Sequence, residues 1–133
     1  MARGFNAIHL KSLAGRKFSG LGNRAQLTTA LTGANNDLLF YARKPGTGGN
    51  AVTGAIVVAG ASTALSVSVV GNAITINSAT TSGSVASSTA RDIETAVRAN
   101  AAANTLVHVQ RKYGDDGTGV VTALTATALS GAV

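Results

Sequence analysis

The sequence has no cysteine and a single proline, and it contains few aromatic and few charged residues. Without cysteine, neither disulfides nor thiolate metal sites can stabilise the fold, and the redox compartment is left open. Because active sites are usually assembled from charged and aromatic side chains, this composition argues against an enzyme. Ala, Thr, Ser, Val and Gly dominate instead, and they predict a core of small and β-branched side chains.

Long apolar runs are also missing. No stretch approaches the ~20 apolar residues that a transmembrane helix needs, so no membrane association is expected. Residues 1–10 lack a continuous apolar segment followed by a small-residue cleavage site, which argues against a secretory signal peptide. We therefore expect a protein that stays in the cell that makes it, or that leaves as part of an assembly.

Positive charge is concentrated in the first third of the chain. Seven basic residues and one acid, Asp37, precede Pro45, whereas the four basic and four acidic residues after it cancel. The formal excess of +6 therefore lies in residues 1–44. Residues 1–36 are rich in Gly, Ser, Asn and Thr, and their apolar residues follow neither a strand nor a helix period. We predict an extended basic N-terminal arm over residues 1–36 and a compact domain over residues 37–133.

The most strongly patterned stretch is residues 65–76. Its branched apolar residues alternate with small residues at the period of a strand: Leu65, Val67, Val69, Ile74 and Ile76. Gly71-Asn72 lies between the two runs and is typical of a two-residue turn. The pattern predicts a β-hairpin with one apolar face, and such a hairpin needs a partner because it is only marginally stable alone.

Further strands are predicted at residues 37–43, 55–59, 106–110 and 120–130. Residues 44–50 between the first two predict a loop, with Pro45-Gly46 suited to a type II turn. The final run reaches almost to the last residue, so we expect the C-terminus to be tied into the sheet.

Residues 89–103 predict one helix, with Ser88 as its N-terminal cap. Small and branched residues recur at helical spacing and form a narrow apolar stripe: Ala90, Ile93, Val97 and Ala101. Polar residues cover the opposite side, where Glu94 and Arg98 form an (i, i+4) pair: Arg91, Glu94, Thr95 and Arg98. We predict an α+β fold in which a small, mostly antiparallel sheet or sandwich is covered by this one helix.

Few residues could carry catalysis or bind a metal. His9 lies in the arm, and His108 alternates with Val107 and Val109, so its side chain should point away from their face. Residues 115–119 (DDGTG) could offer oxygens to a cation, but they lack the pattern of an EF-hand and are also typical of a turn. Residues 46–50 lack the ending of a P-loop. We expect no enzymatic activity, no cofactor and no metal, and we interpret both stretches as loops.

The basic arm is the strongest candidate for binding a partner. Its Lys and Arg residues could contact a nucleic-acid backbone, or they could contact an acidic protein surface. Apolar residues alternate with these charges, which phosphate binding does not require, so we favour the protein surface and expect no nucleic-acid partner. The candidate contact residues are Arg3, Phe5, Ile8, Lys11, Arg16, Lys17, Phe18 and Arg24.

Several short motifs follow one another in a defined order over roughly the last hundred residues. They are NDLLFYA (36–42), GGN (48–50), LSVSV (65–69), GNAITI (71–76), SSTA (87–90), the predicted helix at 93–103, GTGVV (117–121) and ALSG (128–131). In this order they resemble a small module found repeatedly in tailed-bacteriophage virion proteins. The resemblance implies a non-enzymatic building block of heads, necks or tails.

For one module with an arm, the resemblance implies a capsid decoration (cement) protein. Such a protein binds the outside of the shell as a homotrimer and stabilises contacts between neighbouring major capsid protein subunits. Its expected location is the capsid surface of the virion, after assembly in the host cytoplasm. Two alternatives stay open: a neck or tail component, and a nucleic-acid-binding protein that uses the basic arm.

Overall fold

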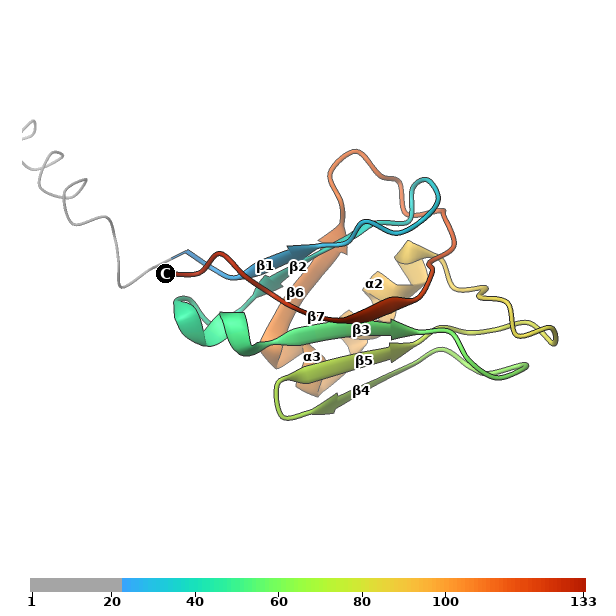
Figure 1. Ribbon diagram of the computed structural model, residues 1–133, viewed down its shortest axis with the longest axis horizontal. Coiled ribbons are helices and arrows are strands. Elements are labelled where there is room, and N and C mark those ends of the chain that lie inside the picture. Colours follow the sequence, from blue (N-terminus) through green and yellow to red (C-terminus); the bar gives the residue numbers. More distant parts are fainter. Residues whose placement is uncertain (1–22) are drawn as a thin grey trace, which may run out of the picture.

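The computed structural model describes residues 23–133 (Figure 1). This part of the chain contains seven strands, two α-helices and a short 3₁₀ helix. The strands are β1 (Gln26–Thr28), β2 (Leu38–Ala42), β3 (Thr53–Val57), β4 (Ser66–Val70), β5 (Ala73–Asn77), β6 (Val107–Arg111) and β7 (Leu124–Ala128). The helices are η1 (Thr47–Ala51), α2 (Ala90–Ala99) and α3 (Ala101–Leu106). The predicted α+β class is confirmed.

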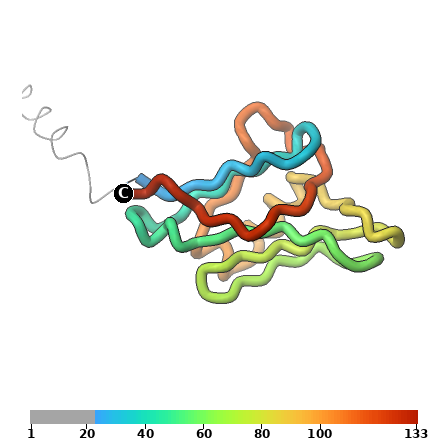
Figure 2. The backbone as a smooth tube through the Cα atoms, viewed as in Figure 1, coloured from blue at the N-terminus to red at the C-terminus, as the bar shows by residue number. Residues whose placement is uncertain are grey.

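The strands form two sheets that are joined at one edge. One sheet has the order β1-β2-β6, and the other has the order β4-β5-β3-β7. All pairs are antiparallel except β3 with β5. Gln26 and Ser130 exchange backbone hydrogen bonds of 2.8 and 3.0 Å, which link β1 to the segment after β7. Figure 2 shows this red C-terminal segment running beside the blue segment that contains β1.

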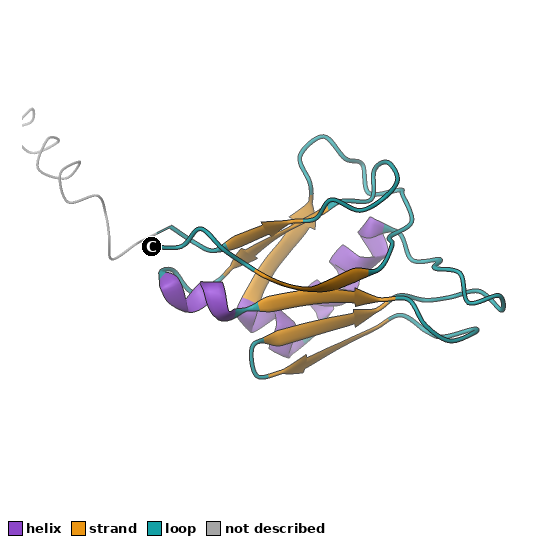
Figure 3. Cartoon of the chain, in the orientation of Figure 1, coloured by secondary structure: helices purple, strands orange, loops and turns teal. Residues whose placement is uncertain are grey.

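Helices α2 and α3 lie behind the strands in Figure 3, where they pack against β6 and β4. Ile93 and Val97 of α2 are fully buried, together with Phe40, Ile74 and Ile76 of the sheets. Phe40 is the largest of these side chains, and most others are branched aliphatic residues or alanines. The interior between sheets and helices is therefore one core of small and β-branched side chains, as the composition predicts.

The predicted hairpin is present as β4 and β5. Val70 lies opposite Ala73 in the register, so Gly71 and Asn72 form a two-residue turn. Gly71 has a φ of 59°, and a glycine with positive φ at the first turn position is typical of a type II′ turn. Ile74 and Ile76 are fully buried, while the facing valines of β4 are half-buried against the core. The apolar face of the hairpin is covered as expected.

The predicted helix differs from the structure at its N-terminus. Thr89, not Ser88, is the N-cap: its Oγ1 accepts from the Asp92 amide at 3.2 Å, and its own amide donates to Asp92 Oδ2 at 2.8 Å. This reciprocal pair is a capping box. Ser88 is buried and its Oγ accepts from the Ala79 amide at 2.9 Å, so it fixes the preceding loop instead.

The predicted single helix is also interrupted. Asn100 has an extended conformation between α2 and α3, and its side chain accepts from the Ala103 amide at 2.9 Å. Asparagine competes for backbone hydrogen bonds in this way, which is why it favours caps over helix interiors. The interruption changes the helical phase, so Ala103 is buried while Ala101 is exposed. The prediction that Ala101 belongs to the apolar stripe is therefore wrong.

Side chains from the helices also cover the free edges of both sheets. Arg98 Nε donates to the carbonyl of Val109 in β6 at 3.1 Å, and Asn100 Nδ2 donates to the carbonyl of Val67 in β4 at 3.0 Å. Unpaired edge carbonyls invite pairing with other chains. One carbonyl of each of these edge strands is therefore satisfied by a side chain from the helical segment.

The expected boundary between arm and domain at residue 36 is displaced toward the N-terminus. Strand β1 pairs with β2, and Ala25 and Asn36 are buried within the domain. A three-residue strand is too short to show a period of two, so the sequence pattern did not reveal it. Residues 1–22 lie outside the described residues, and the arm predicted there stays a prediction.

The loop expected at residues 44–50 contains the short helix η1. Gly46 has φ 82° and ψ −178°, which is not the type II turn expected at Pro45-Gly46 because that turn needs a ψ near zero. At the other end of the chain, Ala132 exchanges two 3.2 Å hydrogen bonds with the side chain of Asn50. The C-terminus is tied into the domain, as predicted.

Candidate interaction surfaces

Of the predicted contact residues, the structure describes only Arg24. Its side chain is exposed, and its guanidinium donates to the carbonyl of Ala42 at 3.3 Å. The other predicted contact residues lie in residues 1–22, outside the described part of the chain: Arg3, Phe5, Ile8, Lys11, Arg16, Lys17 and Phe18.

Three basic residues gather where the described chain begins. Because β1 and β2 are antiparallel, Arg24 before β1 lies beside Arg43 and Lys44 after β2. We call these three residues the basic end. The start of β1 lies at the left of Figure 1, close to the 3₁₀ helix η1. Arg43 Nη2 donates to Asn104 Oδ1 at 2.7 Å, but none of the three forms an ion pair within residues 23–133.

A shallow groove of about 360 Å³ adjoins the basic end. It is lined by Arg24, Tyr41, Ala42, Arg43 and His108, on the outer face of the β1-β2-β6 sheet. His108 is half-buried opposite Tyr41, whereas its neighbours Val107 and Val109 are buried. The prediction that His108 points away from their face is confirmed. Among the described residues, the groove lining contains no Asp or Glu beside this imidazole.

The loop at residues 115–119 has a structural role in this fold. Asp116 Oδ1 accepts from the amide and hydroxyl of Thr118 at 2.9 and 2.7 Å. These hydrogen bonds, aided by the nearby Arg91 and Arg111 guanidiniums, lower the pKa of Asp116. The interpretation of this stretch as a turn therefore agrees with its geometry. Among residues 23–133, no three His, Asp or Glu side chains come together as a metal site.

The same loop satisfies the first amides of α2. The amides of Arg91 and Ala90 donate to the carbonyls of Gly117 and Gly119, both at 3.0 Å. The Gly119 amide in turn donates to the carbonyl of Asn35 at 3.0 Å. Unpartnered amides at a helix N-terminus need such acceptors when they are buried. The loop therefore connects α2 to the segment that leads into β2.

The structure also shows a polar cleft that the sequence pattern did not reveal. It has a volume of about 430 Å³ and lies between α2 and the end of β6. We call it the Glu94 cleft; its lining residues are Glu94, Arg98, Gln110, Arg111, Lys112, Tyr113, Gly114 and Asp115.

At the base of the cleft, Glu94 forms two ion pairs. Its oxygens lie 2.8 Å from Arg98 Nη2 and 3.1 Å from Arg111 Nε. The (i, i+4) pair with Arg98 is confirmed. Glu94, predicted on the polar side of the helix, is nevertheless buried, because α2 packs against β6. Beside the cleft, Lys112 Nζ lies 3.4 Å from Asp37 Oδ2.

The described residues form a small α+β domain with two candidate interaction surfaces, the basic end and the Glu94 cleft. Comparison of the chain with protein-family models, with curated proteins and with solved structures gave no match in any of the three. Within residues 23–133, neither α2 nor α3 has the length and apolar character that crossing a membrane requires.

Proposed function

We propose that this chain is a bacteriophage capsid decoration (cement) protein. In this proposal it binds the outer capsid surface as a homotrimer and stabilises contacts between major capsid protein subunits. The proposal draws on the order of motifs that resembles virion modules. The structural observation that supports it most directly is the basic end, which adjoins the point where residues 1–22 join the domain.

The charge distribution makes this end a suitable contact for an acidic surface. Residues 1–22 contain four basic residues and no acid, and the basic end adds three cations, so residues 1–44 hold seven of the eleven basic residues of the chain. Three of the five acids of the chain have roles elsewhere: Asp37 and Glu94 form ion pairs, and Asp92 caps α2. Positive charge at the basic end is therefore left available to a partner.

A repeating capsid surface would convert weak contacts into firm binding. Each subunit of a homotrimer would contribute one basic end and the basic residues of segment 1–22. Linked contacts raise the overall affinity by orders of magnitude without any new interaction, provided that the geometry allows them to engage together. In this proposal the main attraction is between the basic residues of the chain and acidic residues of the capsid. Because dissolved salt screens such charges, the affinity should fall as the salt concentration rises.

The experiment is co-sedimentation of the purified full chain with expanded, undecorated capsids. Lys44→Glu at the basic end should weaken binding at least tenfold. Arg91→Glu is the charge-matched control, because it changes the net charge equally at a residue of α2 outside the basic end. The change removes the hydrogen bond from Arg91 to the Asp116 carbonyl, so circular dichroism must first show that the variant folds. We expect Arg91→Glu to bind within about twofold of the unmodified chain.

Two results would contradict the proposal. One is equal binding of the two variants. The other is no binding to capsids together with tight, steeply salt-dependent binding to duplex DNA, which would support the nucleic-acid alternative instead. Replacing Arg3, Lys11, Arg16 and Lys17 together by Gln then tests residues 1–22, and we expect this change to abolish sedimentation with capsids.

A further inference from the structure

In each ion pair at the Glu94 cleft the acid is buried and the base is exposed. The Glu94 side chain is 9% exposed, whereas its partners Arg98 and Arg111 are 46% and 39% exposed. In the neighbouring pair, Asp37 is 13% exposed and Lys112 is 45% exposed. The carboxylates of Glu94 and Asp37 therefore lie beneath their partners. Three cations pair with these two acids, so the ion-paired groups carry a net charge of +1 and turn their cationic side to solvent.

The two guanidiniums also keep unused donors. Arg98 uses Nη2 for Glu94 and Nε for the carbonyl of Val109, and Arg111 uses Nε for Glu94 and Nη1 for the carbonyl of Asp116. Neither Arg98 Nη1 nor Arg111 Nη2 donates a hydrogen bond to another residue within 23–133. Glu94 holds both side chains in place, so a ligand would meet preorganised donors and would lose less entropy on binding.

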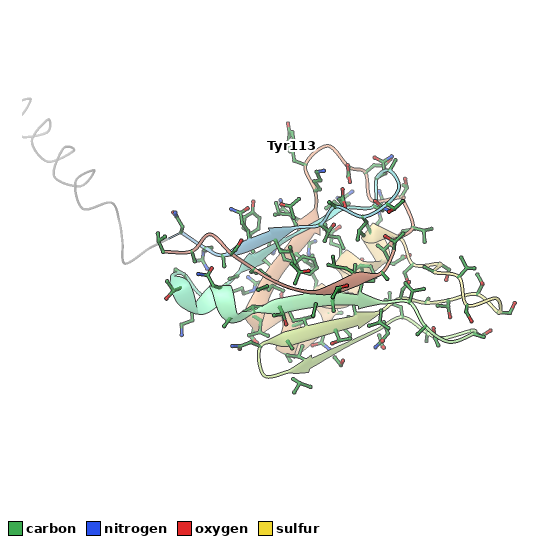
Figure 4. All side chains as sticks on the ribbon, in the orientation of Figure 1. Tyr113 is labelled. Atoms are coloured by element: carbon green, nitrogen blue, oxygen red, sulfur yellow. The ribbon has the colours of Figure 1, made fainter. Side chains whose placement is uncertain are left out.

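An exposed aromatic residue stands at the rim of the same cleft. Tyr113 is 96% exposed and projects from the loop after β6, as Figure 4 shows. Tyrosine and arginine, together with tryptophan, are enriched among the residues that dominate protein–protein binding energies. A tyrosine that contributes nothing to its own core is therefore explained more readily by a partner than by folding.

We infer that the Glu94 cleft is a second docking surface, which takes a carboxylate side chain from an acidic segment of a partner protein. The carboxylate accepts from Arg98 and Arg111, and a neighbouring apolar side chain of the segment packs on Tyr113. A nucleic-acid backbone fits less well, because one aromatic ring offers only a single stacking site for bases.

This surface lies at the opposite end of β6 from the basic end. Strand β6 begins at Val107, beside the groove of the basic end, and its last residue, Arg111, lines the cleft. A domain with an acidic partner at each end would connect two protein surfaces instead of binding one. The inference rests on the cleft alone and does not require the partner to be a capsid.

The test is a site-resolved NMR titration of the full ¹⁵N-labelled chain. The probe is a synthetic heptapeptide of Glu and Asp residues with one central Leu, and the reference peptide carries Gln and Asn at the same positions. The acidic peptide should give saturable shifts of the Arg98 and Arg111 Nε–H signals and of the Gly114 amide. The reference peptide should leave these signals unchanged.

Two variants make the titration decisive. Gln110→Glu places an additional carboxylate in the cleft lining without removing an ion pair, and it should weaken peptide binding at these signals at least fivefold. Thr125→Glu is the control, because it adds the same charge on an exposed position of β7. Tyr113→Ala should weaken binding about threefold, and it should not alter folding because the side chain is exposed.

The inference is overturned if the acidic peptide shifts only signals at the basic end, or if Gln110→Glu and Thr125→Glu bind alike. It is also overturned if a single-stranded oligonucleotide shifts the cleft signals at lower concentration than the peptide does. Because the readout is specific to the cleft, failure here leaves the capsid proposal to be judged by its own experiment.

Discussion

Replacing Gly119 with alanine should destabilise this fold strongly, for a reason that is visible only in the tertiary structure. A Cβ atom at residue 119 would lie 2.0 Å from the carbonyl oxygen of Ala34 and 2.9 Å from Cβ of Asn36. A carbon–oxygen contact needs roughly 3.3 Å, so one of the two segments has to move by more than an ångström. Gly119 does not have a positive φ, and alanine is therefore excluded by lack of space alone.

The size of the effect follows from the hydrogen bonds that this movement would break. The Gly119 amide donates to Asn35 and its carbonyl accepts from the fully buried Ala90, both at 3.0 Å. A buried group that loses its partner costs about 1–3 kcal/mol, so losing both bonds lowers the free energy of unfolding by about 2–6 kcal/mol. For a domain of this size the melting temperature should fall by roughly 8–20 °C.

Urea unfolding followed by far-UV circular dichroism measures this change. Gly83→Ala is the matched control, because its Cβ would lie 3.8 Å from the nearest neighbour, Thr81 Oγ1, which is an ordinary contact. We expect Gly83→Ala to stay within about 0.5 kcal/mol of the unmodified chain. If Gly119→Ala also changed the free energy of unfolding by no more than about 0.5 kcal/mol, the close approach of residue 119 to residues 34–36 would be refuted.

Three further changes test other parts of the fold. Phe40→Ala removes the largest buried side chain and should lower the free energy of unfolding by about 3–5 kcal/mol, measured by the same urea titration. Thr89→Ala removes the α2 cap and should lower it by about 1 kcal/mol, whereas Ser87→Ala, at an exposed residue, should change it little. The pKa of Asp116 is lowered in the folded chain, so its ionised form stabilises the fold above about pH 4 and this stabilisation is lost as the pH falls through the folded pKa. Asp116→Asn should therefore be less stable than the unmodified chain at pH 7, and the difference should shrink below about pH 4; a constant difference would contradict this.

Much of the candidate surface could not be predicted from the sequence, because it depends on segments far apart in the chain. The cationic character of Arg24, Arg43 and Lys44 was evident from composition, but their proximity depends on the pairing of β1 with β2. The Glu94 cleft was even less predictable from the sequence. A helical pattern assigns Glu94 to the polar face, and only the packing of β6 against α2 buries it beneath two arginines.

The sequence alone determined the elements whose signals are local. The β4–β5 hairpin follows from alternation and from a glycine that accepts positive φ, and the α2 stripe follows from helical spacing, because both are properties of neighbouring residues. Tertiary structure alone decided that β3 lies parallel to β5, that residues 25–28 belong to the sheet, and that Gly119 touches residues 34–36. These features have no local period, since each depends on which surfaces the whole chain must bury together.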